Sequence, residues 1–256
     1  MGIVRLGGGG VSGLGGVSGR RRILLMRHGH VDYMSAEVRE SRDPRIARLT
    51  ALGQAQAEAA GAALADLALD VAVCSGLRRT RETAGIVLAA HPAAPVLEDD
   101  PGLEELHSGP YIAFQSREQL AAALTFSFEQ AGAPGATFFP GGEAFASAQA
   151  RAIAAIERLL ARPGWSQALV VAHEGVNRLI LSWMARAGLA GAVAFEQDLA
   201  CINVLDFDLA PAADGSAGIE RMMIKAVNVT PYAWVKAGLH LSSFEAIFSA
   251  AAAEDA

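Results

Sequence analysis

Cysteine, basic charge and long apolar runs are all scarce in this chain, and each shortage excludes a class of protein. Cys74 and Cys201 are the only cysteines, so a disulfide-stapled scaffold is not indicated and both are expected to be small buried residues. The formal charge of −6 provides no basic face for the phosphates of a nucleic acid. No apolar stretch approaches the roughly 20 residues that cross a bilayer.

The first 19 residues are rich in glycine and poor in large apolar side chains. Such a segment buries too little surface to offset the entropy lost on ordering, so we expect residues 1–19 to be a disordered Gly-rich tail. No Gly-Lys-Ser or Gly-Lys-Thr follows these glycines, which excludes a phosphate-binding loop. The glycines also interrupt every hydrophobic run, so the segment lacks the continuous apolar region that a signal peptide requires. We therefore expect a cytoplasmic protein without a membrane or nucleic-acid partner.

Short apolar runs alternate with helical patterns along the rest of the chain. The predicted strands are 23–26, 70–74, 95–97, 168–172, 202–207 and 222–229. The predicted helices are 51–67, one ending near 91, 115–130, 143–161, 175–187 and 242–250. This alternation predicts an α/β fold, a single three-layer α/β/α domain over residues 20–256 with a largely parallel central sheet. We expect residues 30–49 to be a loop and 108–142 to be a helical and loop insertion over the site.

Chemically active side chains follow the predicted strands. Arg27 and His28 end the first strand, Arg79 follows the second, Glu105 the third and His173 the fourth. Ligands of open α/β sheets bind at the carboxyl ends of the strands. Two guanidiniums can hold a phosphate, an imidazole can attack phosphorus, and a carboxyl group can move the proton of the leaving alcohol. Such a site needs no metal if enough cationic donors surround the phosphate.

Four motifs in this order resemble the histidine phosphatase superfamily, in the branch related to cofactor-dependent phosphoglycerate mutase. They are Arg27-His28-Gly29; Ser75, Leu77, Arg79, Thr83 and Ala84; Leu103 to Leu106; and Val170-Val171-Ala172-His173. Weaker similarities are Leu49-Thr50 with Gly53 and Gln54, and Gly141-Gly142-Glu143 before a helix with Arg151. Together the motifs extend from about residue 22 to 207.

The resemblance implies a metal-independent phosphatase that hydrolyses phosphomonoesters through a phosphohistidine. His28 would be the nucleophile, Arg27 and Arg79 would bind the phosphate with His173, and Glu105 would be the acid and base. It implies no cofactor and a small phosphorylated substrate, and it leaves a homodimer open. Glu104 is the alternative to Glu105, although the family's spacing favours Glu105.

Two positions depart from the family's pattern. Met34 stands where members often have an asparagine, and Glu174 where they have a glycine. Loss of an amide donor and gain of a carboxylate would both weaken binding of a highly anionic substrate, if these side chains point inward. We therefore expect either a pocket tuned away from phosphoglycerates or a Glu174 turned aside into a structural pairing.

Two other activities remain as alternatives. A phosphoglycerate mutase-type transferase would carry a longer pattern with Trp and Asn after Arg-His-Gly, which residues 30–34 lack. His28, His30 and Asp32 also resemble the His-x-His-x-Asp zinc site of metallo-β-lactamase-like hydrolases, but Tyr33 replaces a further histidine. Otherwise we expect His30 and Asp32 to face the substrate or the loop above it. A cysteine phosphatase is excluded, because its Cys-x₅-Arg loop, counted from Cys74, would need an arginine at position 80, where this chain has Thr80.

Other conspicuous side chains have ordinary structural explanations. We expect the histidines His91, His107 and His240 to be hydrogen-bonded structural residues. Arg78 and Arg81 are expected to be solvated surface cations, and Trp165, Trp183 and Trp234 to be packing residues. The aromatic residues of the insertion either line the pocket or pack the insertion onto the domain, and the sequence does not decide between the two. They are Tyr111, Phe114, Phe126, Phe128, Phe138 and Phe139.

Overall fold

The computed structural model describes residues 19–110, 116–211 and 217–236, and its centre is a six-stranded sheet. The strands are β1 Arg20–Arg27, β2 Val71–Cys74, β3 Leu97–Asp99, β4 Gln167–Ala172, β5 Ile202–Pro211 and β6 Ala217–Val229. Their order is β3-β2-β4-β1-β5-β6. The first four strands are parallel to one another, and β5 is antiparallel to both of its neighbours, β1 and β6. The predicted largely parallel sheet is therefore confirmed. The predicted tail, apart from residue 19, and the helix 242–250 lie outside the described residues.

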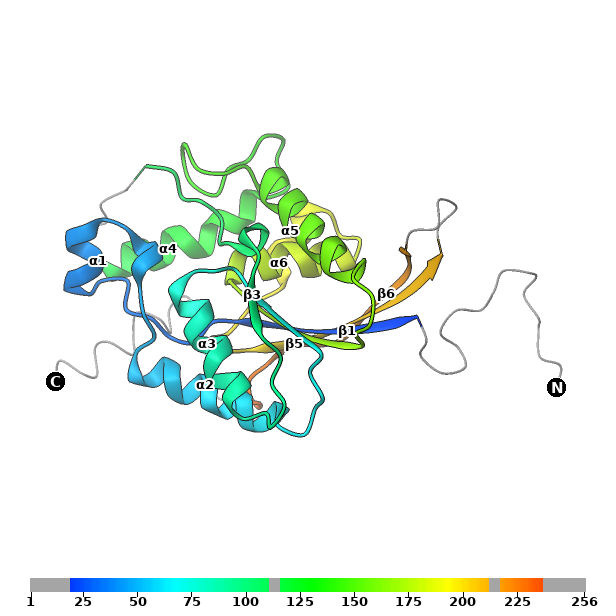
Figure 1. The fold of residues 1–256 in the computed structure, drawn as a ribbon. Helices are drawn as coiled ribbons and strands as arrows, with labels where there is room; N and C mark the ends of the chain where they lie inside the picture. Colours follow the sequence, from blue (N-terminus) through cyan, green and yellow to red (C-terminus); the bar gives the residue numbers. More distant parts are fainter. Residues whose placement is uncertain (1–18, 111–115, 212–216, 237–256) are drawn as a thin grey trace.

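Helices cover both faces of the sheet (Figure 1). They are α1 Ala36–Ser41, α2 Ala51–Leu64, α3 Arg78–Ala89, α4 Arg117–Ser127, α5 Phe145–Leu160 and α6 Glu174–Met184. Short 3₁₀ helices are Pro44–Ile46, Pro101–Leu103, Phe128–Gln130 and Leu189–Ala194. Thr50 caps α2 as predicted, because its side chain accepts a hydrogen bond from the Gly53 N–H.

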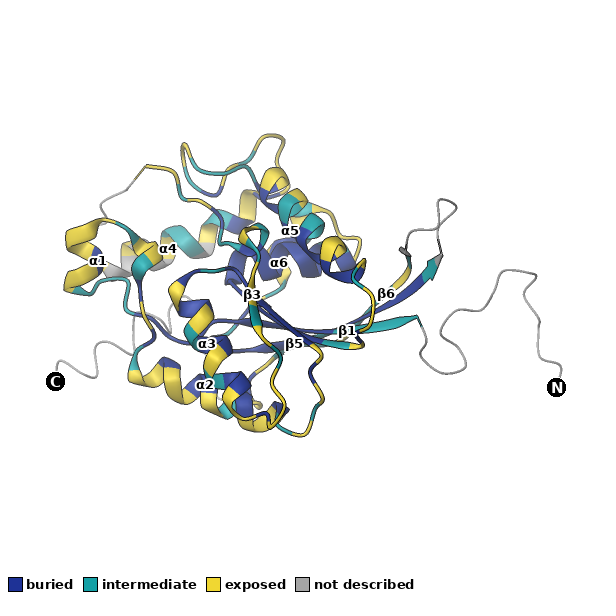
Figure 2. Ribbon diagram, viewed as in Figure 1, coloured by how far each residue is buried: buried dark blue, intermediate teal, exposed yellow. Residues whose placement is uncertain are grey.

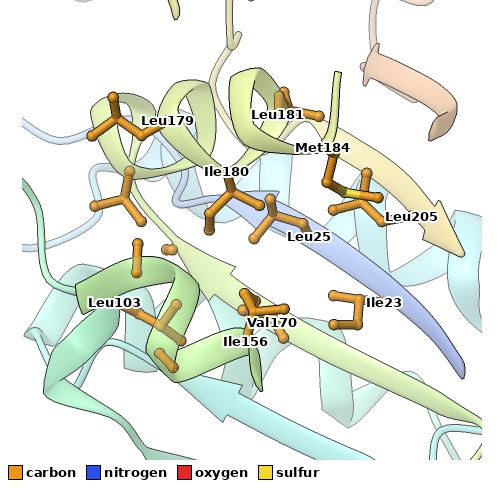
Figure 3. Close-up of a cluster of buried hydrophobic side chains, with 14 of the residues drawn as sticks. Ile23, Leu25, Leu103, Ile156, Val170, Leu179, Ile180, Leu181, Met184 and Leu205 are labelled. Carbon is orange, nitrogen blue, oxygen red and sulfur yellow. The ribbon is translucent and has the colours of Figure 1, made fainter. Parts of the chain in front are cut away.

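The alternation of side chains along β1 explains the three layers. Ile23 and Leu25 join one apolar cluster with α5 and α6, which Figure 3 shows in close-up. Leu24 and Met26 join a second cluster with α2 and α3 on the opposite face. Successive side chains of a strand point to opposite faces, so a strand that is apolar throughout needs a helical layer on each side. Figure 2 shows the same pattern as buried strands between helices with exposed outer faces.

Three expectations need correction. Residues 30–49 are not all loop, since they contain α1 and a 3₁₀ helix. The third strand begins at Leu97 rather than 95, and β5 and β6 extend well beyond the predicted ends. Trp165 is buried and Trp183 stacks on Phe207, but Trp234 is 76% exposed and is not a packing residue in the described structure.

Both cysteines are buried free thiols, as expected. Burial raises the pKa of Cys74 to about 11 and that of Cys201 to about 12. Neither thiol therefore has the lowered pKa of a reactive cysteine. No helix in the described ranges is long and apolar enough to span a bilayer.

Candidate active site

The pairing of β1 with β4 brings the two predicted histidines together. Arg27 is opposite Ala172 in these parallel strands, so His28 and His173, each the next residue, leave the sheet at the same edge. Their ring centroids are 5.2 Å apart and the rings are inclined by 66°. Both side chains are buried.

The hydrogen bonds of His28 define its tautomer. Its Nδ1 lies 2.7 Å from the Gly29 carbonyl oxygen, which can only accept, so Nδ1 carries the hydrogen. Its Nε2 accepts from Nε of Arg79 at 3.2 Å. The lone pair of His28 is therefore on Nε2, the atom beside the Arg79 guanidinium.

Both imidazoles are held in the neutral form. Burial lowers the pKa of His28 well below its ordinary value, and the positive charges of Arg79 and Arg27 lower it further. Burial likewise lowers the pKa of His173, with added contributions from Arg79 and His28. A neutral imidazole is the form that can act as a nucleophile, so the environment keeps His28 in the form that the predicted role would require.

His173 has the opposite tautomer, which follows from a chain of hydroxyl groups. Thr80 Oγ1 donates to the Leu77 carbonyl, so it accepts from Ser75 Oγ at 2.9 Å. Ser75 has then used its only hydrogen and accepts from His173 Nε2 at 2.8 Å. The lone pair of His173 is on Nδ1, which has no hydrogen-bond partner among the described residues.

The two predicted phosphate-binding arginines flank His28. Arg79 lies in the first turn of α3, and its guanidinium also lies 5.7 Å from the centre of the Tyr33 ring. Arg27 donates from Nη1 to the Gln197 carbonyl at 2.5 Å. Both arginines are at most 4% exposed. Two buried guanidiniums beside one imidazole form the cationic end of the site.

Glu174 is buried and pairs with Arg27. Its Oε2 lies 2.7 Å from Nη1 of Arg27, and its Oε1 lies 2.6 Å from Nη2 of Arg178, one helical turn along α6. The pKa of Arg27 is raised, since the negative charge of Glu174 and smaller contributions outweigh the lowering by burial. Glu174 is thus engaged in an ion pair, one of the two expected arrangements, and one of its partners belongs to the predicted phosphate site.

Glu105 is fastened to the beginning of α6. Its Oε1 accepts from the N–H groups of Leu106 and Val176, and its Oε2 accepts from the Gly175 N–H at 3.1 Å. Arg151 donates to the Glu105 carbonyl and so holds the same segment. Oε2 makes one of the two bonds that a carboxylate oxygen can accept, which leaves it an acceptor position.

Gly29 is needed because two segments of backbone approach each other closely at this position. A Cβ on Gly29 would lie 2.4 Å from the Gly53 carbonyl oxygen, and a Cβ on Gly53 would lie 2.2 Å from the His30 oxygen. The two glycines let the start of α2 pack against the segment after β1. The Gly29 N–H also donates to Thr83 Oγ1 at 3.1 Å.

Above these residues is a cavity of about 500 Å³. Arg27, His28, Arg79 and Glu105 line it, whereas His173 is fully buried beside His28 and is not among the lining residues. Side chains from α1 and from the insertion line the same cavity, and Figure 1 shows α1 and α4 over this end of the molecule. Four of the five predicted site residues therefore line one cavity.

Arg78 and Arg81 are surface cations, as expected, whereas Glu104, the alternative to Glu105, also lines the cavity. Arg78 pairs with Glu82 and Arg81 with Asp99 at the surface. Glu104 binds Arg45 at 3.2 Å. His91 is buried with its Nδ1 on the Leu67 carbonyl, and His107 is exposed beside Glu104; His240 lies outside the described residues.

The zinc alternative finds no support in the geometry. His30 is buried with its Nδ1 2.8 Å from Thr50 Oγ1, and Asp32 accepts from the Met34 N–H. Neither lines the cavity, so His30 does not face a substrate there. Within the described ranges no three His, Cys, Asp or Glu side chains form a group that could hold a metal ion.

Sequence reasoning assigned no role to several residues that support the site. Ser75 binds His173, Thr83 binds the Gly29 N–H, Gln197 accepts from Arg27, and Arg151 holds the Glu105 segment. Ser75, Thr83 and Arg151 occur in the motifs and were findable from them. Gln197 acts through its backbone carbonyl, for which the side-chain pattern contains no signal.

Three curated proteins are similar in sequence. An Arabidopsis thaliana protein named "Probable 2-carboxy-D-arabinitol-1-phosphatase" is 28% identical over 82% of this chain, which spans 42% of that longer protein. A Mycobacterium tuberculosis "Acid phosphatase" is 29% identical over 73% of this chain and 87% of its own length. An Erwinia tasmaniensis "Probable phosphoglycerate mutase" is 30% identical over 59% of this chain and 69% of its own.

The fold is also that of solved phosphatase structures. A mycobacterial glucosyl-3-phosphoglycerate phosphatase superposes with a TM-score of 0.63 at 23% identity, over 82% of this chain and 99% of that one. The family model described as "Histidine phosphatase superfamily (branch 1)" matches residues 23–211, which contain every predicted site residue. Because that match covers well over half of the 256 residues, this chain belongs to the histidine phosphatase superfamily, branch 1.

Proposed function

We propose that the chain is a metal-independent phosphatase that hydrolyses phosphomonoesters through a phosphohistidine at His28. The observation that carries the proposal is the tautomer of His28. Its Nε2 lone pair points to the Arg79 guanidinium at the base of the cavity. A phosphate that accepts hydrogen bonds from Arg79 and Arg27 would bring phosphorus to this lone pair.

The proposed reaction has two steps. In the first, His28 Nε2 forms a bond to phosphorus, the bond from phosphorus to the ester oxygen breaks, and Glu105 gives that oxygen a proton. In the second, Glu105 takes a proton from water, the water oxygen bonds to phosphorus, and the N–P electron pair returns to His28. His173 would take up a proton from water at Nδ1 when the phosphate anion binds beside it, and the resulting imidazolium would donate to a phosphoryl oxygen.

A phosphoglycerate mutase is the rival within the family. A mutase must keep the phosphoryl group away from water and give it back to a second acceptor. Residues 30–34 lack the longer pattern of the mutases, and the cavity has Met34 where an amide donor is common. These features favour hydrolysis of the phosphoryl group over its transfer to a phosphoglycerate.

A labelling experiment tests the proposal. Brief incubation with a ³²P-labelled alkyl phosphate and quenching in acid or alkali should leave label on the protein that is acid-labile and alkali-stable. The label and phosphate release should both disappear in His28→Ala and persist in His91→Gln, a buried histidine outside the cavity. Full turnover by His28→Ala would contradict the mechanism, and conversion between 2- and 3-phosphoglycerate without net phosphate release would favour the mutase.

A further inference from the structure

Apolar side chains form much of the cavity wall beyond its cationic base. Met34 and Val38 contribute from the segment after β1, and Leu124, Phe138 and Phe139 from the insertion. The Phe138 and Phe139 rings also pack against each other with centroids 4.7 Å apart. Because these side chains both pack and line the cavity, the insertion presents an apolar surface to the cavity that His28 also lines.

The reacting end of the cavity offers little to a second anionic group. Glu174 neutralises part of the charge of Arg27, and Met34 provides a thioether where an amide would donate. Arg39, Arg42, Arg45 and His107 also line the cavity, but all four are exposed, and Arg45 is paired with Glu104. Water and salt screen exposed charges, so these side chains attract anions in general and discriminate weakly between them.

We infer that the substrate is the phosphomonoester of an alcohol with a bulky apolar body, such as an aryl-alkyl chain. This inference rests on the proposed phosphatase activity. The phosphate binds at Arg27 and Arg79, and the apolar body lies against Met34, Phe138 and Phe139. Transfer of that body from water to the apolar wall supplies the selectivity, and a substrate with a carboxylate there loses hydration without gaining a partner.

Three phosphate esters of primary alcohols test the inference, since their leaving oxygens differ little in acidity. They are 3-phenylpropyl phosphate, n-propyl phosphate and 3-phosphoglycerate. We expect kcat/KM to be at least tenfold higher for 3-phenylpropyl than for n-propyl phosphate, and lowest for 3-phosphoglycerate. Equal values for the two alkyl esters within twofold, or a preference for 3-phosphoglycerate, would overturn the inference.

Met34→Asn places an amide at the position where family members often have an asparagine. It should raise kcat/KM for 3-phosphoglycerate relative to 3-phenylpropyl phosphate by about threefold or more. The matched control is Val96→Asn, because Val96 is 83% exposed and outside the cavity; its ratio should equal that of the wild type. An unchanged ratio in Met34→Asn would count against a role of this wall in selectivity.

Phe139→Ala removes a ring from the wall. It should lower kcat/KM for 3-phenylpropyl phosphate by about tenfold and leave n-propyl phosphate within twofold. An equal loss for both esters would indicate a folding defect, so Phe139→Leu repeats the comparison in a better-packed variant. An equal loss for both esters in Phe139→Leu as well would refute a selective contact.

Failure of the phosphatase proposal is distinguishable from failure of this inference. Release of phosphate from all three esters without preference refutes only the apolar substrate. If none is hydrolysed, the phosphatase is refuted, and calorimetric binding to His28→Ala still decides the ligand class. Binding of 3-phenylpropyl phosphate at least tenfold tighter than n-propyl phosphate would support the apolar wall, and equal binding would refute it.

Discussion

At the scale of single residues, Glu174 is the largest departure from what the motifs predict. A carboxylate at 1% exposure is costly to bury unless cations compensate it, and here Arg27 and Arg178 do so from two directions. The pair with Arg178 follows the helical spacing of four residues, so the sequence contained a signal for it. The pair with Arg27 joins β1 to α6 across 147 positions of sequence, and no local pattern predicts such a contact.

Replacing Glu174 with glutamine tests how much the ion pairs with Arg27 and Arg178 contribute. Glu174→Gln keeps the shape of the side chain but leaves two buried arginines without their carboxylate, so we expect the free energy of unfolding to fall by about 3 kcal/mol. Inorganic phosphate should then stabilise the variant more than the wild type, because Arg27 no longer shares its charge with Glu174. Chemical denaturation with and without phosphate measures both effects.

The matched control is Glu37→Gln, in the exposed pair with Arg48 at 3.7 Å. An exposed pair contributes little, so its unfolding free energy should change by less than about 0.5 kcal/mol, with the wild-type response to phosphate. If Glu174→Gln behaves like this control, the buried ion pair has no influence on the phosphate site.

At the scale of elements, the start of α6 organises the site. His173 is its N-cap residue, Glu174 binds Arg27, and the N–H groups of Gly175 and Val176 hold Glu105. The first N–H groups of a helix have no partner within the helix, and a carboxylate is a favourable one. The proposed nucleophile's neighbour and the proposed acid are therefore positioned by one helix end.

Gly175 leaves room for this arrangement. A Cβ there would lie 2.7 Å from Glu105 Oε1 and 2.6 Å from Leu106 Cδ1. Gly175→Ala should therefore displace the Glu105 carboxylate and lower kcat/KM for alkyl phosphates by roughly tenfold or more. Nitrophenyl phosphate should lose less, because its leaving oxygen is acidic and needs less help from a proton donor.

Gly85→Ala in α3 provides the comparison. Gly85 is exposed, and a Cβ there would meet nothing within 4 Å, so alanine should stabilise the helix by about 0.5–1 kcal/mol with unchanged kinetics. Thermal unfolding and the two-substrate assay apply to both variants. Equal losses for alkyl and nitrophenyl phosphates in Gly175→Ala would argue against Glu105 as the acid.

The success of prediction varied with the kind of element. The strands β2 and β4 were found because both faces are covered, which makes every residue except Gln167 apolar. Helix α1 was missed because it has six residues and one buried side chain, Val38, although Ser35 supplied a capping signal. The first residues of β6 were missed because an edge strand tolerates polar residues, such as Arg221, and the last residues of β5 were missed with them because they pair with this part of β6.

At the scale of the molecule, four parallel strands lie beside an antiparallel pair, and the predicted site lies at the carboxyl ends of the parallel strands. Residues from β1, α3, the segment after β3 and the end of β4 meet there. Chain order and strand character predicted this convergence, because parallel strands place their carboxyl ends together. The hydrogen-bond partners that set the tautomers of His28 and His173 depend on three-dimensional packing and required the structure.

Two neutral buried histidines make the stability of the whole molecule sensitive to acid. In the folded protein the pKa values of His28 and His173 lie well below 6.5, whereas the unfolded chain titrates near 6.5. Their contribution is thus complete above pH 6.5 and is lost as the pH falls towards the folded values. In that window each histidine lowers the free energy of unfolding by about 1.4 kcal/mol for every unit that the pH falls.

We therefore expect the free energy of unfolding to fall by roughly 2–3 kcal/mol between pH 7.5 and 5.5 in phosphate-free buffer. Carboxylates act at lower pH: the Gln167 N–H and the Arg20 guanidinium hold the pKa values of Asp70 and Asp208 below their usual range, so their contributions are lost only near pH 4 and below. His173→Asn removes one titrating imidazole and should roughly halve the loss between pH 7.5 and 5.5, whatever its stability at pH 7.5. Urea denaturation at intervals of half a pH unit measures both curves. A flat wild-type profile, or an unchanged slope in the variant, would show that the buried imidazoles are not held neutral by the fold.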